Sequence, residues 1–174
     1  IKGREPKCSV SSTIDPVVLP MEDSRRVVER AVFSPQGGLV LTSAKAPRPS
    51  TRSEYGVVQV FNASTGSRLA SRQGRHATFT PDSKNVLTVE HDKEHVAHAV
   101  IWGAATGQIN MAFRLDSDLV FDVAFSPRGD GLIVAHSTHA TIYEVTSGKA
   151  TGRLERPEPS LHFKPPTVQA VAFF

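Results

Sequence analysis

Two short landmarks recur along this chain at constant spacing, and they constrain the fold more than any other feature. The first is a phenylalanine followed by Ser or Thr and then Pro; its three copies, each 46 residues apart, are Phe33, Phe79 and Phe125. The second is an aromatic residue with a glycine five positions later; these glycines, each 41 residues apart, are Gly66, Gly107 and Gly148. Two independent landmarks that recur in step indicate three copies of one structural unit.

Each copy is expected to hold four short strands. The first strand ends at the Phe of the first landmark, because the Pro that follows presets φ for a tight turn. The second strand is an unbroken apolar run, typical of a strand buried on both faces, and these runs cover residues 39–41, 86–89 and 132–135. The third strand ends near an aromatic residue (Phe61, Trp102 or Tyr143), and a turn through Ser or Thr and Gly leads into the fourth. Turn residues interrupt the apolar runs about every ten positions, so no long helix is expected.

Four strands in a unit of about 40–45 residues are typical of a β-propeller blade. We therefore predict an all-β fold, a β-propeller of four-stranded antiparallel blades, with three blades and the first strand of a fourth. The blades are expected at about 26–72, 73–115 and 116–155, and residues 167–174 begin the next one. Residues 1–25 are interpreted as an N-terminal arm or the end of a preceding blade. Because propellers close with about four to eight blades, we expect 26–174 to be part of a larger propeller.

From about Arg26 to Leu154, and again in its tail, the chain resembles WD40-repeat proteins, and the two landmark turns carry this resemblance. It departs from the family at the polar positions. The Asp of the Trp-Asp pair is replaced by Asn62, Gly103 and Glu144, and the Gly-His pair expected before the first strand is missing from every unit. We therefore expect the buried hydrogen-bond network of the family to be absent or altered. Divergent propellers, including those of eukaryotic translation initiation factors, show similar losses.

The first unit differs from the others in a long connection between its second and third strands. This connection is locally basic and contains two stiffening prolines. Its candidate partner-binding residues are Lys45, Arg48, Arg52 and Tyr55. An aromatic ring beside spaced cations suits a phosphate-rich or acidic partner. The alternative is a surface loop that binds nothing.

No residues are assigned to catalysis, to a cofactor or to a metal. The sequence contains no Gly-x-Ser-x-Gly, Gly-x-Gly-x-x-Gly or Walker pattern. His91 and His95 are four residues apart, but they fall in a loop between strands, where this spacing does not place them on one helix face. The repeated aromatic residues are expected in the core rather than in a ligand cage.

The composition narrows the class of partner. The formal net charge of +3 is far below that of a typical nucleic-acid-binding domain, and no apolar run approaches the roughly 18 residues of a membrane span. One cysteine permits no internal disulfide and suits an intracellular, cytoplasmic protein. We expect a non-catalytic protein–protein interaction scaffold in a multisubunit assembly. One alternative is a propeller that binds RNA or the ribosome, as in the initiation factors; another is a propeller that gates a hydrolase elsewhere in the full chain.

Overall fold

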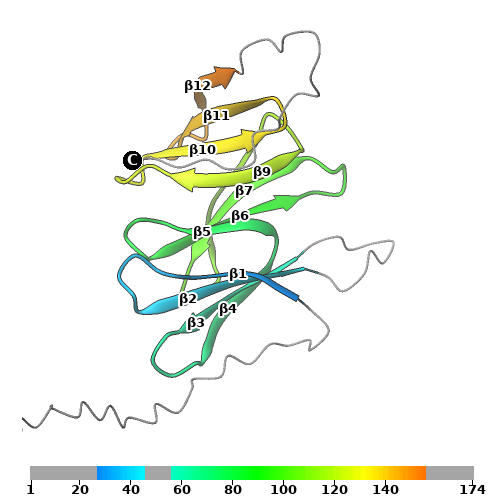
Figure 1. Ribbon diagram of the computed structural model, residues 1–174. Coiled ribbons are helices and arrows are strands. Elements are labelled where there is room, and N and C mark those ends of the chain that lie inside the picture. Colours follow the sequence, from blue (N-terminus) through cyan, green and yellow to red (C-terminus); the bar gives the residue numbers. More distant parts are fainter. Residues whose placement is uncertain (1–26, 46–55, 156–174) are drawn as a thin grey trace, which may run out of the picture.

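The computed structural model describes residues 27–45 and 56–155, and these form three four-stranded antiparallel sheets stacked one on another (Figure 1). The first sheet contains β1 (Val27–Phe33), β2 (Leu39–Lys45), β3 (Val57–Asn62) and β4 (Arg68–Gln73). The second contains β5 (Arg75–Phe79), β6 (Asn85–His91), β7 (Ala97–Gly103) and β8 (Ile109–Arg114). The third contains β9 (Val120–Phe125), β10 (Gly131–His136), β11 (His139–Glu144) and β12 (Ala150–Glu155).

This arrangement confirms the predicted all-β fold of four-stranded antiparallel blades. Each strand pairs with the next one in the chain, so every sheet is a meander. The expected arm at 1–25 and the expected fourth-blade strand at 167–174 lie outside the described residues. In the described part of the chain, no helix has the length and apolar character needed to cross a membrane.

The repeated Phe-Ser/Thr-Pro turn has the same geometry in all three sheets. Its fifth residue has a positive φ each time: 76° at Gly37, 62° at Ser83 and 77° at Gly129. The amide of this residue donates a hydrogen bond to the carbonyl of the Ser or Thr three positions earlier, at 2.8–2.9 Å. Only Ser83 adopts this conformation with a side chain, and its hydroxyl accepts a 3.2 Å hydrogen bond from the Gln36 amide of the first sheet. The turn of the second sheet therefore links this sheet to the first as well as joining two strands.

The middle sheet is apolar on both faces, and each face is covered by a neighbouring sheet. Along β6, Val86 belongs to an apolar cluster with Leu41 of the first sheet. The next residue, Leu87, belongs to a second cluster with Leu132 of the third sheet. All four side chains are at most 2% exposed. Because successive residues of a strand point to opposite faces, one strand contributes to both cores.

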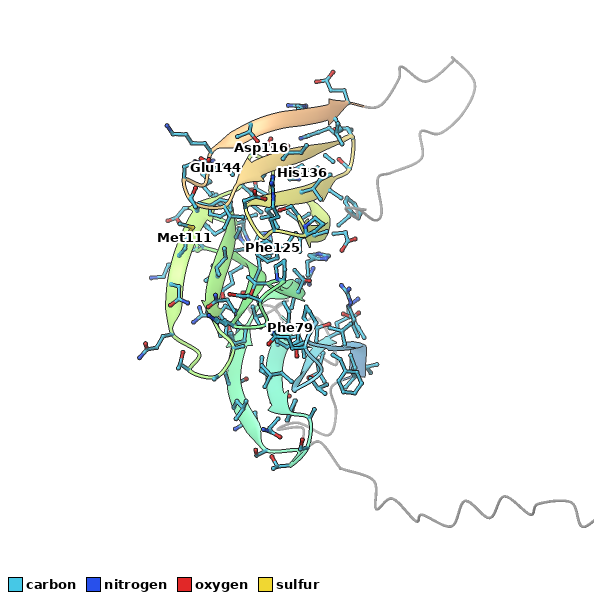
Figure 2. The ribbon with its side chains drawn as sticks, turned by 90° about the vertical axis from the view of Figure 1, so that its left-hand side faces the viewer. Phe79, Met111, Asp116, Phe125, His136 and Glu144 are labelled. Atoms are coloured by element: carbon cyan, nitrogen blue, oxygen red, sulfur yellow. The ribbon has the colours of Figure 1, made fainter. Side chains whose placement is uncertain are left out.

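The landmark phenylalanines join each sheet to the sheet before it. Phe79 lies in the cluster between the first and second sheets, and Phe125 packs against the cluster between the second and third (Figure 2). Phe33, the equivalent residue of the first sheet, is 69% exposed. No sheet precedes it among the described residues, so the exposure of Phe33 follows from its position in the stack.

A chain of polar contacts crosses the first interface. The buried Trp102 indole donates a 3.2 Å hydrogen bond to the Thr88 hydroxyl, which donates in turn to Glu90 Oε1 at 3.1 Å. The Glu90 carboxylate accepts two bonds, at 2.9 and 3.0 Å, from Arg72 of the first sheet. Bidentate, charge-assisted bonds of this kind are the stronger hydrogen bonds of proteins. The polar network of the blade is therefore altered rather than absent.

Two glycines of the second landmark, Gly107 and Gly148, lie against the fourth strand of the sheet before their own. A Cβ on Gly107 would lie 3.5 Å from Ala70 Cβ, which is an ordinary contact. A Cβ on Gly148 would lie 2.6 Å from Phe113 Cβ, which is too close for any side chain. Both glycines have a positive φ, of 70° and 65°.

Gly148→Ala is expected to destabilise the protein more than Gly107→Ala. Both substitutions add left-handed strain of about 1–2 kcal/mol, but only the Gly148 variant also drives a methyl group into Phe113, at a further cost of about 1–3 kcal/mol. Urea unfolding of the two variants measures the difference. An equal decrease in the free energy of unfolding would show that β8 moves to accommodate the methyl group. The close packing of the second and third sheets would then not be needed for stability.

Candidate functional site

Residues of all three sheets line an open hollow of about 440 Å³. Its lining comes from the start of each first strand and from neighbouring segments of the first and second sheets; the residues are Glu29, Arg30, 43–45, Gly56, 74–77, Phe121 and Asp122. In Figure 1, the first strands β1, β5 and β9 follow one another along the stack. The shape of a surface built from all three sheets depends on how the sheets pack, so the stack fixes the relative positions of the strands that line it.

An irregular stretch of β5 shapes the middle of this hollow. The pairing of β5 with β6 shifts register between Arg75 and Thr78, and His76 within this bulge has a positive φ of 50°. Just before it, the Gly74 amide donates a 3.0 Å hydrogen bond to the carbonyl of Gly56, which immediately precedes β3 of the first sheet. A Cβ on Gly56 would lie 2.8 Å from the Ala44 carbonyl oxygen. The absence of a side chain at Gly56 therefore permits the backbones to meet here.

Charges of both signs line the hollow. Lys45 Nζ lies 3.5 Å from Glu29 Oε1, and both side chains are more than half exposed. Burial lowers the pKa of His76, and the nearby Arg75 adds to this effect, while Asp122 and Glu29 act in the opposite direction. The hollow is thus a mixed-charge surface with a partly desolvated imidazole.

Of the four predicted partner-binding residues, the structure describes Lys45, which ends β2 and lines the hollow. Arg48, Arg52 and Tyr55 lie outside the described residues. Lys45 and Gly56, the described residues on either side of this segment, both line the hollow. The sequence did not single out Arg30, Arg75, His76 or the two acidic residues, because they belong to different repeats and meet only through stacking.

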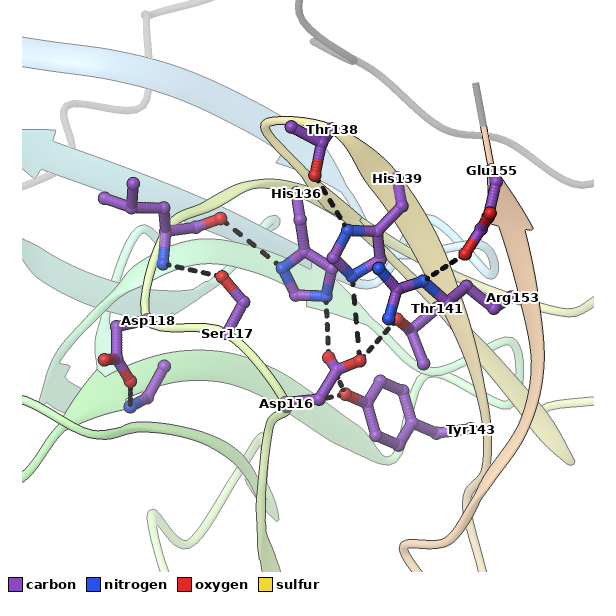
Figure 3. A network of polar contacts seen from close by, with 12 residues as sticks. Asp116, Ser117, Asp118, His136, Thr138, His139, Thr141, Tyr143, Arg153 and Glu155 are labelled. Carbon is purple, nitrogen blue, oxygen red and sulfur yellow. Dashed lines mark hydrogen bonds and ion pairs between the residues drawn. The ribbon is translucent and has the colours of Figure 1, made fainter. Parts of the chain in front are cut away.

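A second polar cluster lies on the third sheet (Figure 3). Asp116 precedes β9, His136 ends β10 and His139 begins β11. Asp116 Oδ1 lies 3.0 Å from His136 Nε2, and Oδ2 lies 3.7 Å from His139 Nε2. The potential ligand atoms of these three residues all lie within 4.8 Å of one another. They are therefore a group in the described part of the chain that could hold a metal ion.

Two hydroxyl groups hold the Asp116 carboxylate in place. Tyr143 donates to Oδ1 at 2.5 Å, and Thr141 donates to Oδ2 at 2.8 Å. Partial burial acts to raise the pKa of Asp116, but these bonds and the nearby His136 hold it below its ordinary value. Burial and the bond to Asp116 raise the pKa of Tyr143. Asp116 is thus an oriented carboxylate.

The histidine pair considered from the sequence does not converge. His91 Nε2 lies 3.0 Å from the Asp118 carbonyl oxygen. His95 lies in a turn with a positive φ of 64°, and Asp92 pairs instead with His98 at 3.0 Å. The repeated aromatic residues, by contrast, lie in the core as predicted: Phe61, Trp102 and Tyr143 are at most 2% exposed.

The Asp116 cluster was missed because its members are not joined by one motif. His136 and His139 face each other across a two-residue turn, and Asp116 arrives from a loop twenty residues earlier in the chain. The sequence does carry one signal for this cluster: two histidines three positions apart flank a predicted tight turn, which indicates that their side chains lie close together. The position of Asp116 depends on the path of the loop.

No known protein family and no curated protein matches this sequence. Among solved structures, the chain is similar in fold to U3-55K, with a TM-score of 0.57 and 15% identity over 75% of this chain and 40% of that one. It is also similar to acylaminoacyl peptidase from Pyrococcus horikoshii, with a TM-score of 0.61 and 10% identity over 76% of this chain and 25% of that one. These propeller-like structures support the fold assignment. The chain spans less than half of either protein.

Because the pKa of His76 is lowered in the folded state, the free energy of unfolding is expected to decrease in mild acid. The unfolded chain takes up the proton near the ordinary pKa of 6.5, before the folded state does, so this contribution is present above pH 6.5 and is lost as the pH falls below it. In His76→Asn, which retains a residue tolerant of positive φ, the free energy of unfolding is expected to fall less between pH 7.5 and 5.5 than in the wild type. Urea unfolding at the two pH values measures this, and identical losses would contradict the burial of His76.

Proposed function

We propose that this chain is a non-catalytic interaction scaffold and that the hollow at the starts of the first strands binds its protein partner. The observation that carries the proposal is that all three sheets contribute to one concave surface. Rigid strands hold most of its polar side chains, so a partner can be recognised without prior ordering of these groups. Lys45, the first residue of the predicted basic connection, lines the same surface.

The charges favour a protein over a nucleic acid as the partner. Nucleic-acid affinity depends mainly on cations that neutralise phosphates. Glu29 and Asp122 place carboxylates among the cations Arg30, Lys45 and Arg75 of the hollow. Carboxylates would repel phosphates, whereas mixed charge can match a protein surface of alternating sign. Binding of RNA or the ribosome is the alternative.

The similar solved structures support a propeller-like fold and leave the choice of partner open. The similarity to a quarter of a peptidase chain concerns fold only, so the idea of a propeller that gates a hydrolase has less support than the scaffold. The absence of catalysis stays a prediction. The single cysteine supports an intracellular, cytoplasmic setting for the proposed assembly.

The experiment compares partner recovery by the wild type and by the double variant Arg30→Glu/Lys45→Glu. Reversing two charges in the hollow is expected to reduce recovery of partner proteins from a lysate of the source cells by about tenfold or more, since misplaced like charges cost several kcal/mol at an interface. Quantitative mass spectrometry of the captured proteins measures this loss.

Arg128→Glu is the matched control. Arg128 lies beyond the other end of β9, is 86% exposed in its side chain and does not line the hollow, so its reversal is expected to leave recovery unchanged. Equal recovery by wild type and double variant would contradict the proposed surface. Binding of a fluorescent single-stranded RNA that weakens steeply with salt, and that the double variant loses, would instead favour the RNA alternative.

A further inference from the structure

The geometry around Asp116 contains two buried nitrogen atoms without hydrogen-bond partners. His136 Nε2 and His139 Nε2 are both buried, and neither makes a hydrogen bond of acceptable geometry in the structure. His136 is fully buried, with a side-chain exposure of 1%. Its Nε2 is nonetheless 3.0 Å from Asp116 Oδ1, so distance alone would allow a bond that the angles do not. Buried polar atoms without partners are rare in folded proteins and call for an explanation.

The other nitrogen of each ring already has a partner. His136 Nδ1 lies 3.4 Å from the Leu119 carbonyl oxygen, and His139 Nδ1 lies 3.1 Å from the Thr138 hydroxyl. A carbonyl oxygen can only accept, so this contact places the proton of a neutral His136 ring on Nδ1 and leaves a lone pair on Nε2. A backbone carbonyl that fixes the tautomer in this way is a common outer partner of metal-bound histidines.

The carboxylate between the two rings completes a set of three ligands. A lone pair on Nε2 and a carboxylate oxygen 3.0 Å away repel each other unless a positive charge lies near both. Two imidazolium rings could provide that charge, but their centroids are only 4.7 Å apart and His136 is shielded from water. One divalent cation would neutralise the carboxylate and bind the Nε2 lone pair of His136. It would also bind that of His139 when the His139 ring proton is on Nδ1 and is donated to the Thr138 hydroxyl. The bonds from Tyr143 and Thr141 orient the carboxylate for this task.

We propose that Asp116, His136 and His139 bind one divalent transition-metal ion of the Zn²⁺ type. Imidazole nitrogens and a carboxylate are usual zinc ligands, and bond lengths of about 2.0–2.1 Å in a tetrahedral site place ligand atoms about 3.4 Å apart. The candidate ligand atoms, one from each residue, lie within 4.8 Å of one another, so small side-chain rotations would bring them to this separation. Three protein ligands leave a fourth position for water or for a group of a partner. This proposal departs from the expectation, drawn from the sequence, that the chain holds no metal.

Such an ion would join the connection between the second and third sheets to the turn between β10 and β11. Asp116 belongs to the segment that leaves β8 and enters β9, while both histidines flank that turn. The metal would therefore fix the third sheet against the connection from the second, at the place where Tyr143 reaches Asp116. Its binding energy adds to folding because the unfolded chain does not hold the three ligands together.

The test is a titration of chelator-treated, dialysed protein with Zn²⁺ by calorimetry and with Co²⁺ by visible absorption. The wild type is expected to bind one ion per chain, with Co²⁺ bands of a low-coordinate site. His139→Asn keeps a polar group near the Thr138 hydroxyl but removes Nε2, and it is expected to weaken binding by at least about 100-fold, since even outer-shell partners are worth about 10- to 100-fold. Asp116→Asn is expected to have a similar effect.

His98→Asn is the matched control, because His98 also pairs with a carboxylate at 3.0 Å but has no second histidine in that pair. Its binding is expected to equal that of the wild type. Circular dichroism checks that each variant folds. Absence of stoichiometric binding, or binding that survives both cluster substitutions, would overturn the proposal.

Histidine side-chain NMR of the wild type gives a second readout that needs no variant. Of the seven histidines, two are expected to shift at Nε2 when Zn²⁺ is added. A shift confined to His91, His95 or His98 would assign the ion to the surface loop and contradict the proposed site. No shift at saturating Zn²⁺ would likewise overturn it.

Discussion

The structure depends on the burial of both faces of each sheet. A four-stranded sheet with apolar residues on both faces is stable only where neighbours cover it, and the middle sheet shows this most completely. Val86 and Leu87 are adjacent in β6, yet they contribute to different apolar clusters. Stacking therefore supplies the core that no single blade contains. It also brings the first strands of all three blades to one hollow, so the proposed binding surface and the stability of the fold have the same physical origin.

The apolar packing between sheets is similar at both interfaces, but the polar contacts differ from one interface to the other. Between the first and second sheets, Arg72, Glu90, Thr88 and Trp102 form a continuous chain of hydrogen bonds. On the third sheet, the aromatic position carries Tyr143, whose hydroxyl reaches Asp116 instead. The apolar positions tolerate exchange among similar residues, whereas a buried polar group requires a specific partner. This explains how the chain repeats the apolar positions of a propeller-like blade without repeating one set of polar residues.

The blades could be predicted because short turn motifs and apolar runs, which act locally, recur in every unit of the sequence. The phenylalanine of each Phe-Ser/Thr-Pro turn is the last residue of β1, β5 or β9, as the turn chemistry requires. The sequence did not predict the hollow or the Asp116 cluster, because both depend on distances between different strands. His136 and His139 approach through a tight turn, but Asp116 joins them only through the path of a loop. Of the predicted basic connection, Lys45 alone could be placed, and it lies at the hollow through the end of β2.

Hydrogen exchange of the backbone amides tests most directly the claim that stacking stabilises the blades. Exchange from strands covered on both faces requires the stack to open, whereas outer strands can fray separately. The account predicts the slowest exchange in β6 and β7, whose residues from Val86 to Val89 and from Ala99 to Trp102 are at most 5% exposed, and the fastest in β4 and β12. Equal protection of all three sheets, or slower exchange in β12 than in β6, would contradict it.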